Sequence, residues 1–100
     1  MLGGGERISR LKGRMVTSEI RFHNKTEIKA QAQVFAGETL IGTFLVSPGD
    51  TCRIPADSGS YDIFLRNGVT GRELARKLES DARSLTLLKE RDGWFVLSDG

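Results

Sequence analysis

Apolar and polar residues alternate along several short stretches of this chain, and alternation of this kind is typical of β-strands with one buried face. In residues 28–34 every even position is apolar and every odd position is lysine or glutamine. Residues 61–66 alternate in the same way, with Tyr61, Ile63 and Leu65 on the parity that we expect to face the core. Both stretches predict strands of an antiparallel sheet.

Turn-forming residues punctuate the chain between these stretches. The turn signals are Asn24-Lys25-Thr26, Ala36-Gly37-Glu38, Ser47-Pro48-Gly49-Asp50, Asp57-Ser58-Gly59-Ser60, Asn67-Gly68-Val69-Thr70-Gly71 and Arg91-Asp92-Gly93. The strands that they separate are predicted at 16–23, 28–34, 39–46, 51–54, 61–66, 85–90 and 94–97. Short strands at a spacing of roughly 8–12 residues predict a sandwich or a barrel.

The segment 71–83 is open to two interpretations. Thr70 and Glu73 have capping-box spacing, and a helical stripe of leucine and alanine follows them. Thr70-Gly71 is equally typical of a hairpin loop whose glycine takes the left-handed conformation, and strands precede and follow the segment. We interpret it as a strand, with a single covering helix as the alternative. The predicted fold is therefore an all-β, antiparallel two-sheet sandwich, Ig-like, with about seven or eight short strands.

The charge distribution divides the chain into an arm and a body. Residues 1–14 carry four basic side chains against one acidic side chain, whereas residues 15–100 carry 11 basic and 12 acidic ones. The arm also contains three consecutive glycines and few large apolar residues. We therefore expect a flexible basic arm at 1–14 and a nearly neutral sandwich domain at 15–100.

The start of the chain and the length of its apolar runs bear on where in the cell the protein is located. Residues 1–7 lack the apolar stretch of a signal peptide, and no run is long enough to span a membrane. With one cysteine and no intrachain disulfide, the default expectation is a cytoplasmic protein without a membrane partner. The Asn24-Lys25-Thr26 glycosylation pattern is accordingly interpreted as a polar turn.

The chain is poor in residues that carry out catalysis or bind metals. His23 is its one histidine and Cys52 its one cysteine, too few for a zinc or blue-copper site. A Cys52–His23 pair would form a nucleophilic site only if the fold brought both side chains together, and Cys52 has the pattern of a small buried residue. The sequence contains no Asp-x-Asp spacing of the kind that indicates a calcium site. We expect no catalytic residues, no metal and no cofactor.

Several apolar side chains fall on the parity that faces solvent. Phe64 lies between Asp62 and Arg66 on the outward parity of its strand. Trp94 and Phe95 are adjacent, so one of them faces away from the core. Clustered outward apolar groups mark an interface or a ligand surface. The candidate binding residues are therefore Phe64, Arg66, Trp94 and Phe95.

These observations favour a non-enzymatic interaction module that binds its partner through loops or outer-face aromatics. The expected partner is a protein, a carbohydrate or, in a homodimer, a second copy of the chain. One alternative is nucleic-acid binding assisted by the basic arm, which the nearly neutral body disfavours. A second alternative is a small hydrolase with an unrecognised carboxylate site, which the scarcity of histidine and cysteine disfavours.

Overall fold

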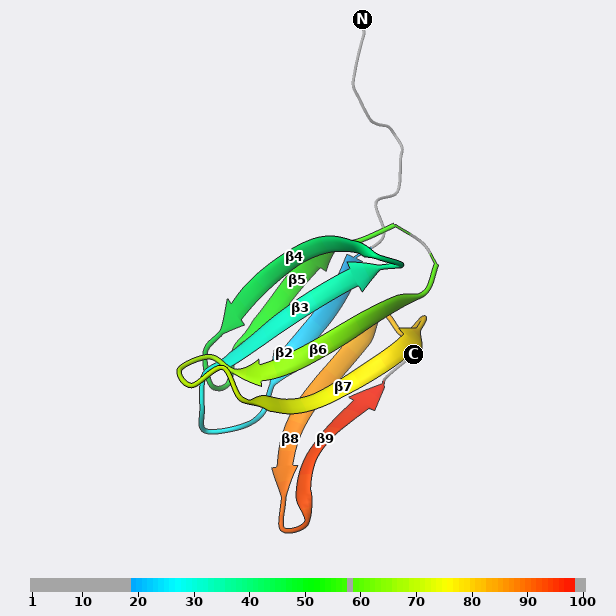
Figure 1. Ribbon diagram of the computed structural model, residues 1–100. Coiled ribbons are helices and arrows are strands. Elements are labelled where there is room, and N and C mark those ends of the chain that lie inside the picture. Colours follow the sequence, from blue (N-terminus) through cyan, green and yellow to red (C-terminus); the bar gives the residue numbers. More distant parts are fainter. Residues whose placement is uncertain (1–18, 58, 99–100) are drawn as a thin grey trace, which may run out of the picture.

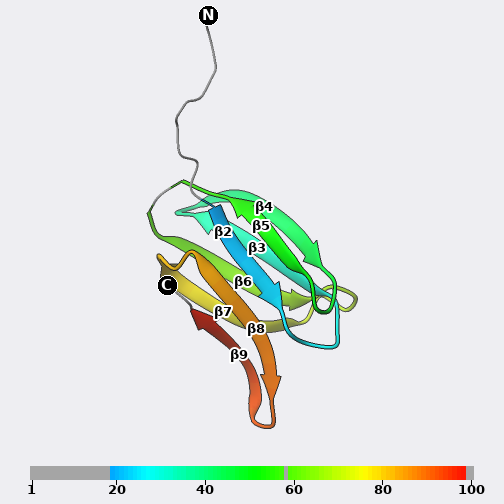
Figure 2. The same ribbon diagram turned by 180° about the vertical axis from the view of Figure 1, so that it is seen from behind.

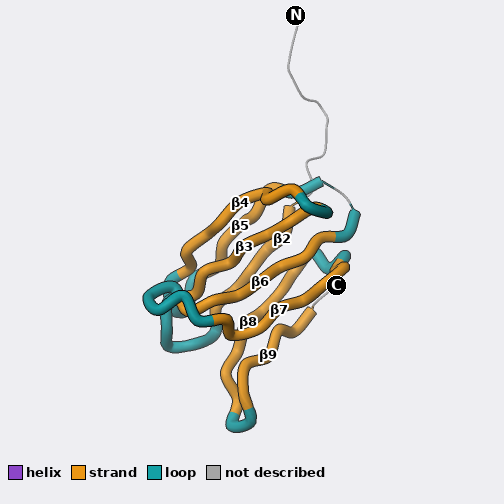
Figure 3. The backbone as a smooth tube through the Cα atoms, in the orientation of Figure 1, coloured by secondary structure: helices purple, strands orange, loops and turns teal. Residues whose placement is uncertain are grey.

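The computed structural model describes residues 19–57 and 59–98. These residues form eight strands and no helix, and so include no helix that could cross a membrane (Figure 3). The strands are β2 (Glu19–Asn24), β3 (Ala30–Ala36), β4 (Thr39–Val46), β5 (Thr51–Pro55), β6 (Tyr61–Asn67), β7 (Glu73–Ser80), β8 (Ser84–Glu90) and β9 (Gly93–Ser98). The arm predicted at 1–14 and the first residues of the strand predicted at 16–23 lie outside the described residues.

The strands form two four-stranded sheets that pack face to face. The first sheet has the order β5-β2-β8-β9 and the second the order β4-β3-β6-β7. The second sheet is the nearer layer in Figure 1, and the first sheet is the nearer layer in the opposite view of Figure 2. The predicted two-sheet sandwich is confirmed.

The connections follow a simple rule. The β3–β4, β6–β7 and β8–β9 pairs are hairpins within one sheet, and the remaining described connections cross between the sheets. All neighbouring strands are antiparallel except β2 and β8, which lie parallel in the middle of the first sheet. An immunoglobulin constant domain divides its strands four and three between the sheets. Within the described residues this sandwich divides its strands four and four and contains one parallel pair.

The contested segment is strand β7, as the hairpin interpretation of Thr70-Gly71 predicted, and the described residues contain no helix at 71–83. Gly71 has φ +80° and ends the turn between β6 and β7. The register with β6 shifts twice along β7, and Glu79 has φ +52°. These irregularities explain why no period-two pattern is visible in this part of the sequence.

The core lies between the sheets and contains the residues that the alternation placed inward. Ala30, Ala32 and Val34 of β3 and Ile63 and Leu65 of β6 are fully buried. The first sheet contributes a matching layer of fully buried side chains, Ile20, Phe22, Ile54, Leu85 and Leu87. Because both sheets bury one face only, their outer faces remain available to solvent or to partners.

Asn24 at the end of β2 connects the two sheets through a buried hydrogen-bond network. Its Nδ2 donates to the carbonyls of Ile28 (2.8 Å) and Val46 (3.0 Å), and Val46 belongs to the second sheet. Its Oδ1 accepts from the backbone N–H (3.0 Å) and the hydroxyl (2.6 Å) of Thr26. The predicted polar turn at Asn24-Lys25-Thr26 is therefore a structural link, and the nitrogen that a glycan would need is occupied in the folded protein.

Candidate binding face

The outer face of the second sheet carries two phenylalanines in contact. Phe64 of β6 pairs with Gln33 of β3, and Phe35 lies diagonally across from it. The two rings meet edge to face, with centroids 5.7 Å apart and planes at 89°. This T-shaped arrangement is a favoured one for aromatic pairs. We call the surface formed by Gln33, Phe35, Phe64, Arg66 and Arg76 the aromatic face.

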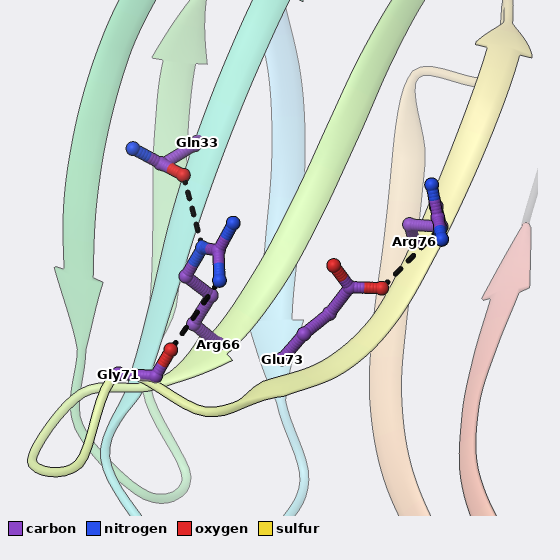
Figure 4. Close-up of polar contacts among 5 residues, drawn as sticks. All are labelled: Gln33, Arg66, Gly71, Glu73 and Arg76. Carbon is purple, nitrogen blue, oxygen red and sulfur yellow. Dashed lines mark hydrogen bonds and ion pairs between the residues drawn. The ribbon is translucent and has the colours of Figure 1, made fainter.

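Arg66 is held beside these rings by hydrogen bonds from two directions. Its Nε donates to Gln33 Oε1 (3.1 Å), and its Nη1 donates to the Gly71 carbonyl (3.3 Å). Figure 4 shows the guanidinium between β3 and the β6–β7 turn. A guanidinium has five N–H donors, so these two bonds fix its orientation and leave donor capacity for a ligand.

The β6–β7 turn that supports Arg66 is itself ordered by Asn67. The Asn67 Oδ1 accepts from the backbone N–H groups of Val69 (2.8 Å) and Thr70 (3.1 Å), and the Gly71 N–H donates to the Asn67 carbonyl (2.8 Å). Asparagine favours turns because its side chain can bond the backbone two residues further on. The carbonyl that receives Arg66 therefore has a fixed position.

Arg76 of β7 completes the face on its other side. It lies opposite Phe64 in the sheet, and its guanidinium carbon is 5.9 Å from the Phe64 ring centroid, within cation–π range. Its Nε also forms an ion pair with Glu73 Oε2 at 3.2 Å (Figure 4). Both ion-pair partners are substantially exposed, so the ion pair itself contributes little to stability.

Exposed leucines extend the apolar surface toward the edges of this sheet. Leu40 and Leu45 of β4 are 48% and 60% exposed, and each pairs with an outward residue of β3. Leu78 of β7, 53% exposed, has the same parity as Arg76. Together with the phenylalanines, these leucines give the outer face of the second sheet apolar side chains on each of its four strands.

The four predicted site residues do not form one patch. Phe64 and Arg66 lie together on the aromatic face, whereas Phe95 lies on the outer face of the first sheet, where it pairs with Leu88. Trp94 has the opposite parity, shares its side of the sheet with Leu87 and Val96, and packs against the core. The sequence indicated that one of Trp94 and Phe95 faces outward, and that residue is Phe95.

Trp94 is only partly covered by the core. It lines a depression of about 400 Å³ between the β8–β9 hairpin and residues 25–28, and Lys89 Nζ lies 5.7 Å from its ring centroid. A lysine over an indole is a favourable contact that also shields the ring. Trp94 therefore lines a depression that is separate from the aromatic face.

Sequence reasoning did not single out Phe35, Gln33 or Arg76. Phe35 and Gln33 share the outward parity of β3 with Gln31, so the alternation alone could have located them. Arg76 offered no such signal, because its place opposite Phe64 depends on a register that shifts within β7.

The two residues considered for nucleophilic chemistry are directed to opposite sides of the first sheet. Cys52 pairs with the buried Phe22 and packs against the core, and burial raises the pKa of its thiol. His23 pairs with Thr51 on the outer side, where its Nδ1 lies 2.7 Å from the Thr51 Oγ1. The fold does not bring Cys52 and His23 together as a dyad.

The described residues contain no cluster of three or more His, Cys, Asp or Glu side chains that could hold a metal ion. Comparison with protein-family models and with curated proteins found no match for this sequence. The class that fold and site define is thus a two-sheet β-sandwich with an aromatic and arginine-bearing outer face. Its function has to be argued from that face, since a fold alone does not imply an activity.

Proposed function

We propose that this chain is a non-enzymatic interaction module that binds a protein partner through the aromatic face. The observation that carries the proposal is the Phe35–Phe64 pair on an outer sheet face, with Arg66 on the same strand as Phe64 and Arg76 over the Phe64 ring. Aromatic residues and arginine are enriched in protein interfaces and dominate their binding energy. The exposed leucines at both edges would widen the contact area.

Preorganisation also supports the proposal. The backbone of the face is part of a sheet, and Arg66 is already oriented by Gln33 and Gly71. A partner that contacts these side chains would therefore lose less conformational entropy than one that has to order free side chains. A carboxylate of the partner would be a suitable acceptor for the remaining Arg66 donors.

The geometry favours protein over carbohydrate as the ligand. The two rings are perpendicular rather than side by side, and the Arg76 guanidinium lies over Phe64. They therefore offer no continuous flat platform for the face of a sugar ring. Leucines at the edges of the face suit apolar side chains of a protein better than the hydroxyl groups of a glycan.

The test is a selection of peptides or small domains from a display library against the full chain, followed by affinity measurements on Phe64→Asp and Phe95→Asp. Phe95 is a matched control because it is a partly exposed phenylalanine on the outer face of the other sheet. We expect Phe64→Asp to weaken binding at least about tenfold, or ~1.4 kcal/mol, and Phe95→Asp to leave it unchanged.

Three results would contradict the proposal. These are a selection that yields no binder, equal losses in the two variants, and binders unaffected by Phe64→Asp. A glycan array with the same proteins examines the carbohydrate alternative: glycan binding lost only in Phe64→Asp, without peptide binding, would assign the face to carbohydrate instead. Urea denaturation of each variant verifies that the fold is retained.

A further inference from the structure

The two sheets formed by residues 19–57 and 59–98 have four edge strands, and two of these are protected against pairing with another chain. β5 carries Arg53 and ends at Pro55. β7 carries four charged side chains, two register shifts and the positive-φ residue Glu79. Charges, proline and bulges are the features by which natural proteins prevent edge-to-edge association.

The third edge, β4, has no charged residue but is interrupted. Its register with β3 shifts between Val34 and Phe35, so that Ile41 is an extra residue beside Gly42. A bulge of this kind bends the strand and disrupts the ladder of backbone groups that a new strand would need.

β9 has none of these protective features. Its sequence Gly93–Ser98 contains no charged residue and no proline, and it pairs with β8 in an unbroken register. Phe95 and Leu97 are 43% and 56% exposed on the outer face of the first sheet. Figures 1 and 2 show that the β8–β9 hairpin extends past the ends of the other strands, which leaves the part of β9 nearest the turn accessible.

A strand like β9 is suited to pairing with its own copy. In an edge strand, backbone N–H and C=O groups of alternate residues are directed away from the neighbouring strand, so an added strand can bond them. Around a two-fold axis, residue i of one copy meets residue j of the other and j meets i. Because Gly93–Ser98 contains no charged residue, no charged side chains meet where the two β9 strands overlap, whatever the two-fold register.

We propose that β9 pairs antiparallel with β9 of a second copy, and thereby joins the two first sheets into one continuous eight-stranded sheet. Phe95, Leu97 and Leu88 then form an apolar strip that crosses the two-fold axis on the outer face. This surface is separate from the aromatic face, so the dimer leaves that face free.

The test is sedimentation equilibrium of the full chain over a range of concentrations, with Leu97→Lys and Leu45→Lys as a matched pair. Both leucines are exposed to a similar extent on outward positions of edge strands, one in each sheet. We expect a dimer for the wild type and for Leu45→Lys. For Leu97→Lys we expect a dimer dissociation constant raised at least about tenfold, as two inserted charges would meet near the axis.

A second measurement observes the contact itself. In a Cys52→Ser background, a nitroxide at Leu97→Cys should show strong dipolar broadening between copies, and one at Leu45→Cys should not. If urea denaturation finds Leu97→Lys unfolded, Phe95→Lys takes its place.

The proposal is overturned by a monomeric wild type, by a dimer that neither β9 substitution weakens, or by equal weakening in Leu45→Lys. A monomer whose β9 binds an added strand-forming peptide also overturns it, and would assign the edge to a different partner.

Discussion

The Tyr61 hydroxyl donates a hydrogen bond to the backbone carbonyl of Ala82, so that the first residue of β6 is fastened to the connection that leads into β8. The Ser80 hydroxyl donates to the same phenol oxygen at 3.3 Å, and all three residues are buried. Because β6 and β8 belong to different sheets, this contact fixes one end of the sandwich.

Replacing Tyr61 with phenylalanine should therefore lower the free energy of unfolding by about 1–2 kcal/mol, since the Ala82 carbonyl and the Ser80 hydroxyl lose their partner in a buried place. Urea denaturation measures the change. Ser80→Ala is the comparison. It keeps the bond from Tyr61 to the Ala82 carbonyl and removes two longer bonds of 3.3 Å, one that the Ser80 hydroxyl donates to Tyr61 and one that it accepts from the Ala82 N–H, so it should cost less. Equal losses in the two variants would contradict this account.

The same tyrosine predicts a loss of stability in alkali. Burial raises the pKa of the Tyr61 hydroxyl above its ordinary value, so the folded state holds this proton more tightly than the unfolded chain. Its contribution is fully present below the pKa of an unfolded tyrosine, at about pH 10. It is lost as the pH rises from there through the higher folded-state pKa.

Unfolding measured between pH 9 and pH 11.5 should thus show a steeper fall in stability for the wild type than for Tyr61→Phe. The difference between the two slopes isolates the contribution of Tyr61 from that of every group that the two proteins share. Parallel curves would mean that Tyr61 does not contribute.

Substitution of Asn24 should be among the most destabilising changes in the chain. Asn24→Ala removes the side-chain donor to the Val46 carbonyl, one of two side-chain donors to the Ile28 carbonyl, and the acceptor of Thr26. We expect a loss of about 3 kcal/mol or more in urea denaturation.

Asn67→Ala is a suitable control, because its side chain orders an exposed turn and its loss should cost about 1 kcal/mol. Asn24→Asp keeps the acceptor oxygen and removes both donors. If the donors to Ile28 and Val46 are what matters, Asn24→Asp will be destabilised as well; wild-type stability would exclude that role.

Gly71 offers a test of the turn that supports Arg66. A Cβ at this position meets nothing within 4 Å, so the cost of Gly71→Ala comes from its φ of +80° alone. The expected loss is about 1–2 kcal/mol. Gly71→Asn should cost less, because asparagine tolerates the left-handed conformation. A larger loss in Gly71→Asn than in Gly71→Ala would indicate a different cause.

Cys52 should react slowly with thiol reagents in native buffer, because its side chain packs against the core and burial raises the pKa of its thiol. The control is Thr51→Cys in a Cys52→Ser background, which places the thiol on the exposed side of β5 one residue earlier. We expect the control to react at least about tenfold faster at pH 7. Similar rates would show that Cys52 is accessible.

The alternation of apolar and polar residues was sufficient to predict the sandwich and most of its inward-facing residues. Ala30, Ala32, Val34, Ile63 and Leu65 are all buried as predicted. This part succeeds because one-sided burial determines the parity of each strand by itself.

The composition of the binding face was harder to predict. Parity places Phe64 and Phe95 on outward positions, but it does not say to which sheet a strand belongs, so the sequence could not separate their two faces. Trp94 shows the same limit, because only the register of β9 with β8, which puts Trp94 on the same side as the buried Leu87, identifies it as the inward member of the Trp94–Phe95 pair. Pairing between distant strands is a property of the whole fold.

The parallel pair in the first sheet has a consequence for how the chain folds. Phe22 of β2 lies beside Leu85 of β8, 63 positions later (85 − 22). During synthesis β2 can acquire β5 as a neighbour early, whereas its other side has to wait for β8. Such non-local pairing is associated with folding in milliseconds to seconds rather than microseconds. A nascent or truncated chain that ends before β8 would expose the unpaired side of β2 together with Phe22, which makes the completion of β8 the step that protects this protein from aggregation.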